Sequence, residues 1–288
     1  MIHSIDPAAC TGCGTCTKTC PLDVFRLEPA QEALSPCMAA CPAGVDIRGN
    51  HYLIQQGHLG EAARRYRSVQ PFPAITGRVC FHPCEKKCAR NHVDEAVNIN
   101  AVEQIIGDWD LKAPLEKPAQ RHITKVAVIG SGPAGLSCAW FLAQMGYPVT
   151  VFEAMPLPGG MLRYGIPAYR LPDAIVAAHI ARLEAMGIAF RCNTKIGEGA
   201  DLSLSDLKRL GFKAVMLAPG TTVSRKVHME GVELPGVHWG LEFLRANRGD
   251  EQPSLSGDVL VIGGGDVAVD AAITAKRLGA AKVSMACL

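Results

Sequence analysis

The sequence predicts an α/β protein in which a short cysteine segment and a helical domain precede two Rossmann-type units of alternating strands and helices. Three observations support this fold class. Nine of the 12 cysteines lie within the first 88 of the 288 residues. Amphipathic helical patterns cover residues 45–69 and 96–111. From Thr124 onward, short apolar runs end at glycine-rich turns, which is typical of buried parallel strands.

The composition narrows the class of protein. Charged residues make up 19% and hydrophobic residues 48%, which argues against disorder, and the length suffices for about two domains. A net charge of +2 argues against a nucleic-acid binder that depends on bulk charge. No apolar run approaches the ~18 residues of a membrane span, and the N-terminus has no signal-peptide pattern. We therefore expect a cytoplasmic protein whose clustered thiols serve metal or redox centres rather than disulfides.

The first cysteine cluster lies in a segment that we place at residues 1–27. Its spacing, CxxCxxCxxxC followed by Pro21, is that of the bacterial ferredoxin run. Gly12 and Gly14 give the loop the backbone freedom to wrap thiolates around an iron–sulfur cube. A zinc knot is the alternative, but zinc sites usually pair two distant CxxC units. The predicted [4Fe–4S] ligands are Cys10, Cys13, Cys16 and Cys20, of which Cys20 serves this cluster or a neighbouring one.

A second cysteine set lies in the predicted helical domain, residues 28–115. Within each group of this set, neighbouring cysteines are separated by three residues. This spacing places successive thiols about one helical turn apart, on one side of a chain that wraps a metal. Five thiols exceed the needs of one [4Fe–4S] cube and fall short of two. The set consists of Cys37, Cys41, Cys80, Cys84 and Cys88, and we interpret His82 as a loop residue that supports the ligands.

The strands and helices of the second half follow from its alternation of apolar runs and glycine turns. Residues 112–121 carry two prolines and mixed charge, and form the predicted linker. The next unit, residues 122–255, is predicted to contain strands 125–129, 148–152, 188–192 and 213–218 and helices 133–145 and 173–186. The last unit, residues 256–288, repeats the pattern with strand 258–262, helix 266–278 and strand 281–287. Crossover helices of this kind predict parallel sheets.

A GxGxxG motif over residues 128–135 joins a predicted strand to a predicted helix. Gly130 makes the tight turn, Gly132 lets the backbone approach a pyrophosphate, and Gly135 lets the helix pack on the strand. The positive end of the helix then faces the phosphates. Glu153 ends the second strand, 18 residues after Gly135, where an acidic side chain takes ribose hydroxyls. Together these features predict a dinucleotide site.

A second motif, GxGxxA, lies between a strand and a helix in residues 261–268. By the same reasoning, Gly263, Gly265 and Ala268 would receive NAD(P)H. Two tandem motifs of this kind predict a protein with two dinucleotide sites. Because the chain stops at Leu288, we expect a fragment or one half of a split polypeptide. The residue that distinguishes NADH from NADPH would lie at or just after that end.

Three stretches of the helical domain carry a family resemblance. Residues 41–47 (CPAGVDI), 77–88 (GRVCFHPCEKKC) and 97–99 (VNI) resemble the N-terminal module of the glutamate synthase small subunit, and dihydropyrimidine dehydrogenase carries a similar module. The resemblance implies two [4Fe–4S] clusters. It assigns Cys41, Cys80, Cys84 and Glu103 to one cluster and matches Cys37 and Cys88 to the other. The CxxC of the family is absent upstream of Cys37, where residues 32–36 read EALSP, and a solvated helix face is the alternative for Glu103.

The resemblance also identifies the first nucleotide. It implies that residues 158–167, with Gly159 and Gly160, lie along FAD, and that residues 217–220, ending at Gly220, form a second flavin-contacting turn. A glycine-rich surface loop is the alternative for both. The full expectation is a ferredoxin-like segment, an α-helical iron–sulfur domain, a Rossmann-type FAD domain and the start of a Rossmann-type NAD(P) domain.

These observations predict an oxidoreductase that passes electrons between NAD(P)H, FAD and 4Fe–4S clusters, to or from a catalytic partner subunit or ferredoxin. No proton-transferring pair or nucleophile stands out, so no catalytic side chain is predicted. The rival hypothesis is a non-catalytic iron–sulfur relay or assembly subunit with incomplete nucleotide folds, and a weaker one is a zinc-stabilised scaffold. The isolated Cys138, Cys192 and Cys287 are expected in the core.

Overall fold

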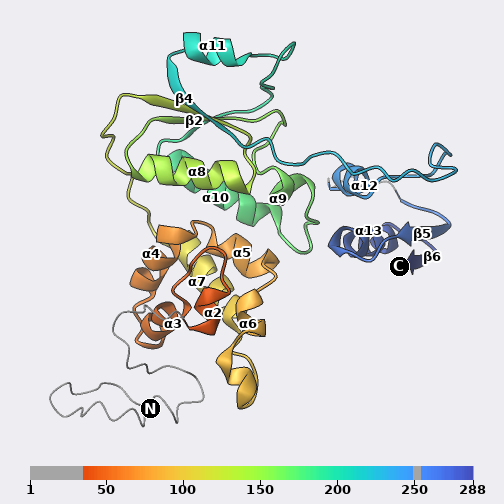
Figure 1. Cartoon of the computed structure of the whole chain (residues 1–288), viewed down its shortest axis with the longest axis horizontal. Helices are drawn as coiled ribbons and strands as arrows, with labels where there is room; N and C mark the ends of the chain where they lie inside the picture. The colour runs from red at the N-terminus through yellow and green to blue at the C-terminus, as the bar shows by residue number, and fades with distance from the viewer. Residues whose placement is uncertain (1–34, 249–253, 288) are drawn as a thin grey trace. The chain divides into compact units, whose positions relative to one another are not determined.

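The computed structural model describes residues 35–248 and 254–287. The chain divides into two compact units, Met1–Ala113 and Pro114–Leu288 (Figure 1). The predicted ferredoxin-type segment 1–27, with its four cysteine ligands, lies outside the described residues. Within the described ranges, no helix combines the length and the apolar character needed to cross a membrane.

The described part of the first unit is helical, as the sequence predicts. Its helices are α2 (Pro36–Ala39), α3 (Ile47–Gln55), α4 (Leu59–Val69), α5 (Pro73–Val79), α6 (Pro83–Lys86), the 3-10 helix η1 (Ala89–His92) and α7 (Ile99–Lys112). The amphipathic stretch over 45–69 forms two helices, because Gly57 adopts φ +80° just after α3. Helix α7 follows Asn98, whose side chain accepts a hydrogen bond from the amide of Ala101 and caps the helix.

Helices α5 and α7 meet backbone to backbone. A Cβ atom added to Gly107 would lie 2.2 Å from the backbone of α5, and one added to Gly77 would lie 2.5 Å from Gln104 Cα. Glycine on both helices permits this approach, since any other residue would push the backbones apart. The contact sets Glu103 of α7 against the side chains of α5.

One hydrophobic cluster forms the core of the first unit. It comprises Val45, Ile47, Leu53, Ala62, Ala63, Tyr66, Cys84, Ile99 and Ile106. Cys37 and Cys41 pack against this cluster. Three of the predicted ligand thiols therefore belong to the core or border it.

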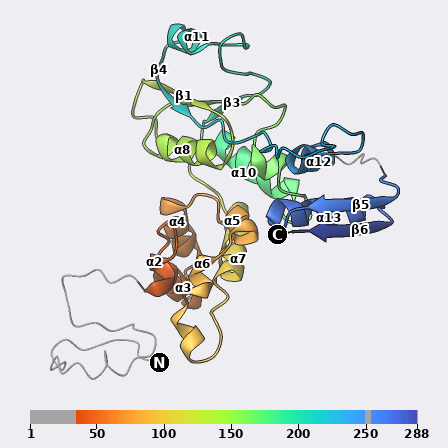
Figure 2. The same ribbon diagram turned by 45° about the vertical axis from the view of Figure 1, so that its right-hand side comes forward.

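Four parallel strands form the central sheet of the second unit. They are β1 (Lys125–Ile129), β2 (Val149–Phe152), β3 (Ala189–Arg191) and β4 (Phe212–Leu217), in the order β3-β2-β1-β4. Helices α8 (Pro133–Gln144) and α10 (Asp173–Ala185) lie on one side of the sheet and α11 (Leu204–Arg209) on the other (Figures 1 and 2). The predicted strands and helices are confirmed. The short helices α9 (Met161–Tyr164), α11 and α12 (Gly240–Ala246) were not predicted.

A separate parallel pair of strands follows, β5 (Asp258–Ile262) and β6 (Lys282–Ala286), joined by α13 (Asp266–Arg277) (Figure 2). This confirms the second predicted strand–helix–strand pattern. The expectation for the isolated cysteines is wrong at Cys287, which is exposed, while Cys138 and Cys192 are only partly buried. Cys287 follows β6, which has a neighbouring strand on one side only, so no packed layer covers its thiol.

Candidate functional site

Four of the predicted cluster ligands come from different elements of the first unit. Cys41 follows α2, Cys80 ends α5, Cys84 lies in α6 and Glu103 in α7. Burial raises the pKa of the Cys80 thiol, and the negative charges of Glu103 and Cys41 raise it further. Burial also raises the pKa of Cys84 to about 11, with further contributions from the charges of Glu85, Cys41 and Cys80. These side chains therefore share one electrostatic environment.

The chemistry of this donor set fits an iron–sulfur cluster. Thiols that are buried beside one another and beside a carboxyl group resist ionisation, and a positively charged iron centre removes that resistance by stabilising the thiolates. Among the residues that the structure describes, no three His, Cys, Asp or Glu side chains lie close enough together to hold a metal ion.

Glu103 is held in place by hydrogen bonds rather than exposed on a helix face. Its Oε1 accepts hydrogen bonds from Thr76 Oγ1 of α5 and from Gln70 Nε2, the latter at 3.2 Å. Burial raises the pKa of Glu103, although the bond from Thr76 opposes this rise. The carboxyl group is therefore partly buried against α5 and Gln70, which argues against a fully solvated helix face.

The remaining described thiols lie nearby but have other contacts. Cys37 Sγ lies 3.1 Å from Ser35 Oγ, and Cys88 is buried after α6. His82 adopts φ 39°, its amide donates to Cys80 Sγ at 3.3 Å, and its Nδ1 lies 2.9 Å from Cys80 O. His82 therefore fixes the loop that presents Cys80, as interpreted from the sequence.

The first dinucleotide motif forms a turn in which two glycines are tightly enclosed and one is open. Gly130 adopts φ +99°, and a Cβ atom there would lie 2.1 Å from Ala218 O. A Cβ atom on Gly135 would lie 1.9 Å from Gly130 O, so α8 packs directly on the turn. Gly132 has no atom within 4 Å of its Cβ position, and no side chain caps the N-terminus of α8 that follows it. The turn and the free helix end together fit a pyrophosphate.

Glu153 holds this turn through Ser131, a residue that the sequence analysis missed. Glu153 Oε2 accepts hydrogen bonds from Ser131 N at 3.0 Å and from Ser131 Oγ, and Oε1 accepts one from Met155 N at 2.9 Å. Ser131 Oγ also accepts a hydrogen bond from Gly159 N at 2.9 Å. Ser131 occupies a variable position of the motif, so only its small polar side chain could have drawn attention. Glu153 thus fixes the turn, and Oε1 retains capacity to accept from ribose hydroxyls.

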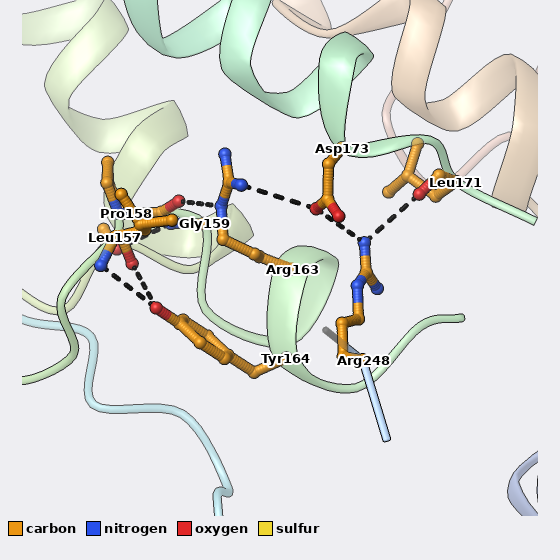
Figure 3. A network of polar contacts seen from close by, with 9 residues as sticks. Leu157, Pro158, Gly159, Arg163, Tyr164, Leu171, Asp173 and Arg248 are labelled. Carbon is orange, nitrogen blue, oxygen red and sulfur yellow. Dashed lines mark hydrogen bonds and ion pairs between the residues drawn. The ribbon is translucent and has the colours of Figure 1, made fainter. Parts of the chain in front are cut away.

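The Pro-Gly-Gly turn at residues 158–160 lies directly against the first motif. Gly160 adopts φ +51°, and a Cβ atom there would lie 2.7 Å from Gly132 Cα. Figure 3 shows the contacts that hold this turn: Arg163 Nε donates to Pro158 O at 2.9 Å, and the Tyr164 hydroxyl bonds both the amide and the carbonyl of Leu157. The turn is therefore fixed by its own flanking helix α9.

A group of ion pairs connects α9 with the start of α10. Arg163 and Arg248 both contact Asp173 Oδ1, at 3.4 and 3.0 Å, and Arg248 also donates to Leu171 O (Figure 3). The second predicted flavin turn lies against the first glycine motif instead, because Ala218 N donates to Ile129 O at 2.8 Å at the end of β1. Gly220 ends that turn with φ +66°.

The second motif has the same local geometry at the end of β5. Gly263 adopts φ +132° and its amide donates to Ala286 O of β6 at 2.7 Å. A Cβ atom on Gly263 would lie 3.4 Å from Ala268 Cβ, so the helix again packs on the turn. Gly265 has no atom within 4 Å of its Cβ position and precedes α13, which no side chain caps. This turn can therefore receive a second phosphate group.

Asp270 of α13 joins the segment after α9 to this second motif, and sequence reasoning missed it. Tyr169 Oη donates to Asp270 Oδ1 at 3.0 Å, and Arg170 Nη1 donates to Oδ2 at 2.8 Å. The Arg277 guanidinium stacks over the Tyr169 ring at 3.9 Å. A cavity of about 120 Å³ beside them is lined by Tyr169, Arg248 and Arg277, among others. It is smaller than the few hundred Å³ of a typical ligand site.

Three family profiles match the chain in sequence order. The 4Fe-4S binding domain family matches residues 3–26. The dihydropyrimidine dehydrogenase domain II family, described as a 4Fe-4S cluster domain, matches residues 31–114. The pyridine nucleotide-disulphide oxidoreductase family matches residues 124–286. These profiles imply the cofactors expected from the sequence, namely 4Fe–4S clusters, FAD and NAD(P)H.

Three named relatives are similar to this chain in sequence. The NADP(+)-dependent formate dehydrogenase subunit beta of Moorella thermoacetica is 37% identical, over 87% of this chain and 39% of its own length. The NAD-dependent dihydropyrimidine dehydrogenase subunit PreT of Salmonella typhimurium is 36% identical, over 87% of this chain and 61% of its own length. The NADH glutamate synthase of Schizosaccharomyces pombe is 35% identical, over 84% of this chain and 12% of its own length.

The chain thus spans well under half the length of the formate dehydrogenase subunit. The match to glutamate synthase and the dihydropyrimidine dehydrogenase profile confirm the resemblance that the cysteine and glycine motifs indicated. With a profile match over residues 124–286 and two iron–sulfur profiles before it, the chain belongs to the pyridine nucleotide-disulphide oxidoreductase family.

Proposed function

We propose that this chain is the electron-transferring part of an iron–sulfur flavoprotein that passes electrons between NAD(P)H, FAD and [4Fe–4S] clusters. Its electrons go to, or come from, a catalytic partner subunit or ferredoxin. One observation carries the proposal: the open, uncapped nucleotide turn at Gly132 occurs in the same chain as a set of buried and partly buried thiols. Two of the relatives are named as subunits, which supports a partner.

The residues of the chain have binding and orienting roles in this proposal. Flavin accepts two electrons from a reduced nicotinamide and releases them singly to clusters that carry one each. Gly132 and the N-terminus of α8 would hold the FAD pyrophosphate, and Glu153 would hold the turn and contact the ribose. Gly159, Gly160 and Gly220 would border the flavin. No side chain of the chain needs to transfer a proton in the nicotinamide half-reaction.

The second motif and the cysteines complete the assignment. Gly263, Gly265 and Ala268 would bind NAD(P)H by the same turn geometry. The cluster ligands would be Cys41, Cys80, Cys84 and Glu103, with Cys37 and Cys88 serving a second cluster and the four cysteines of segment 1–27 a further one.

We also propose the domain limits and the location. The limits are 1–27 for the ferredoxin-type segment, 28–115 for the helical iron–sulfur domain, 122–255 for the FAD domain and 256–288 for the NAD(P) domain. The iron–sulfur profiles over residues 3–26 and 31–114 support the first two limits, whereas the oxidoreductase profile over residues 124–286 spans both nucleotide domains. The cytoplasm would keep the cysteines reduced for cluster assembly.

The proposal is tested on protein purified without oxygen, together with its partner chains. Iron, acid-labile sulfide and flavin are measured per chain, and NADH or NADPH is then mixed rapidly with the protein. We expect flavin bleaching followed by the paramagnetic signal of reduced clusters. Clusters without flavin, and without NAD(P)H-dependent reduction of an artificial dye, would leave only the relay hypothesis standing. Zinc in place of iron and sulfide would support the scaffold hypothesis.

A further inference from the structure

Tyr66, on α4, carries a buried hydroxyl group without a partner. The residue is 1% exposed, and its Oη has no hydrogen-bond partner among the described residues. A buried hydroxyl that has given up water without gaining a bond is unfavourable, and native proteins retain few of them. Phenylalanine would fill the same space without that hydroxyl. The group therefore calls for an acceptor that the described residues 35–248 and 254–287 do not supply.

The surroundings of Tyr66 indicate which acceptor this is. Tyr66 belongs to the same buried cluster as Cys84, and Cys41 packs against that cluster. Burial raises the pKa of Tyr66, and the negative charges of Glu103, Cys84 and Cys41 raise it further. These three groups are among the four ligands assigned to one cluster above. The phenol thus lies beside the residues assigned as ligands, and its O–H group can act as a hydrogen-bond donor.

The end of α4 ties Tyr66 to the carboxylate ligand. Tyr66 O accepts a hydrogen bond from Gln70 N at 2.7 Å, and Gln70 Nε2 donates to Glu103 Oε1 at 3.2 Å. Gln70 is itself buried, and its Oε1 accepts from Phe72 N at 2.8 Å. The last turn of α4 is therefore fixed relative to the ligand that α7 supplies, and the position of the Tyr66 ring is fixed with it.

We propose that Tyr66 donates a hydrogen bond from Oη to the iron–sulfur cluster held by Cys41, Cys80, Cys84 and Glu103, and that this bond raises the reduction potential of that cluster. The proposal rests on the proposed function, since it needs the cluster. A cluster gains one negative charge when it accepts an electron, and hydrogen bonds to charged acceptors are the stronger ones. The donor therefore favours the reduced form, and burial strengthens the effect. Tyr66 is a positioning residue, not a ligand, and its phenol is chemically unchanged.

The test compares Tyr66→Phe with the wild-type protein, purified without oxygen with its partner chains. We expect unchanged iron and sulfide content. In a potentiometric titration followed by electron paramagnetic resonance, one cluster should become harder to reduce. At a fixed potential its ratio of reduced to oxidised form should fall roughly tenfold, which corresponds to about 59 mV for a one-electron couple. The matched control is Tyr52→Phe, on α3 and 58% exposed, which should leave the titration unchanged.

A second readout identifies the bond itself. After exchange into heavy water, pulsed magnetic resonance of the reduced wild-type cluster should show a coupled exchangeable proton that Tyr66→Phe lacks. A Tyr66→Phe protein with full cluster content, an unchanged titration and an unchanged proton coupling would overturn the proposal. Wild-type protein without iron and sulfide would overturn both this proposal and the proposed function, whereas an unresponsive variant overturns this one alone.

A further variant covers the case in which Tyr66→Phe fails to retain the cluster. Incorporation of 3-fluorotyrosine at position 66 keeps the ring and the hydroxyl but makes the phenol a stronger donor. We expect the potential of the same cluster to rise, opposite in sign to the change in Tyr66→Phe. No shift in the fluorinated protein would contradict a hydrogen bond from Tyr66 to the cluster.

Discussion

Gly132 and Gly135 belong to one motif, yet their substitution by alanine should have opposite consequences. At Gly135 an added Cβ would lie 1.9 Å from Gly130 O, whereas real Cβ atoms stay beyond 3.0 Å, so the helix or the turn must move by about 1.1 Å, the difference. Overpacking of this kind lowers the free energy of unfolding by about 3 kcal/mol at the upper end of its range. The higher helix propensity of alanine relative to glycine offsets this loss by up to ~1 kcal/mol. The net loss of stability is about 2 kcal/mol.

Gly132→Ala meets no such obstacle in the protein. Its backbone lies at φ −71° and ψ −178°, which alanine adopts freely, and no atom lies within 4 Å of the added Cβ. The weaker capping by alanine and the lower entropy of the unfolded chain nearly cancel, so stability should change by less than ~0.5 kcal/mol. The methyl group would instead occupy the space assigned to the pyrophosphate. Flavin affinity should fall at least about tenfold, or ~1.4 kcal/mol.

Two measurements separate these effects. Thermal unfolding of the flavin-free protein should place Gly135→Ala roughly 4 to 8 °C below wild type, as expected for a unit of this size, and Gly132→Ala within about 2 °C. Flavin retained per chain after desalting should fall in Gly132→Ala. The reasoning fails if Gly132→Ala unfolds as early as Gly135→Ala, or if it retains flavin as well as wild type.

Three further predictions concern side chains of both units. Glu153→Gln should destabilise the second unit by about 1.5 to 3 kcal/mol in urea unfolding. The side-chain NH2 group of glutamine would then face a backbone N–H group such as that of Ser131, so that two donors meet and a hydrogen bond is lost. An unchanged urea midpoint would show that the charge of Glu153 is not needed there. Burial and Asp270 raise the pKa of Tyr169 from 10.0 to about 12, so its contribution to stability is full below about pH 10 and is lost as pH rises toward 12. Wild-type stability should therefore fall more steeply than that of Tyr169→Phe between denaturant titrations at about pH 9.5 and 11.5, and parallel curves would refute this. Glu103→Ala should remove the iron and sulfide of one cluster, while the exposed control Glu95→Ala retains them, and equal metal content in the two variants would exclude Glu103 as a ligand.

The regular elements of the second unit could be predicted because each has a clear local pattern. Strands such as Lys125–Ile129 are short apolar runs that end at glycine, and α8 and α10 carry several turns of helical spacing. The short helices could not be predicted, because four to seven residues do not complete two turns of a periodic pattern. Helix α12, for example, begins at Gly240 and ends after Ala246.

The candidate site was predictable only where residue type alone determines the role. Cysteine spacing and the glycine motifs identify candidate residues directly. Contacts between residues that are far apart in the sequence leave no such pattern. Asp270 meets Arg170 across 100 residues, and Ser131 meets Glu153 across 22. In the sequence Tyr66 resembles any core aromatic residue, and only the structure shows that its hydroxyl has no partner within the described part of the chain.

The close approach of α5 and α7 bears on how fast electrons can enter and leave the first unit. A one-electron centre exchanges charge rapidly when the atoms around it shift little between oxidation states. Cys80 ends α5 and Glu103 lies on α7, and the two helices are locked together where Gly77 and Gly107 exclude every side chain. A slide or tilt of either helix would have to break this close backbone contact. Two residues that contribute no side chain would thus keep the reorganisation energy of the cluster small.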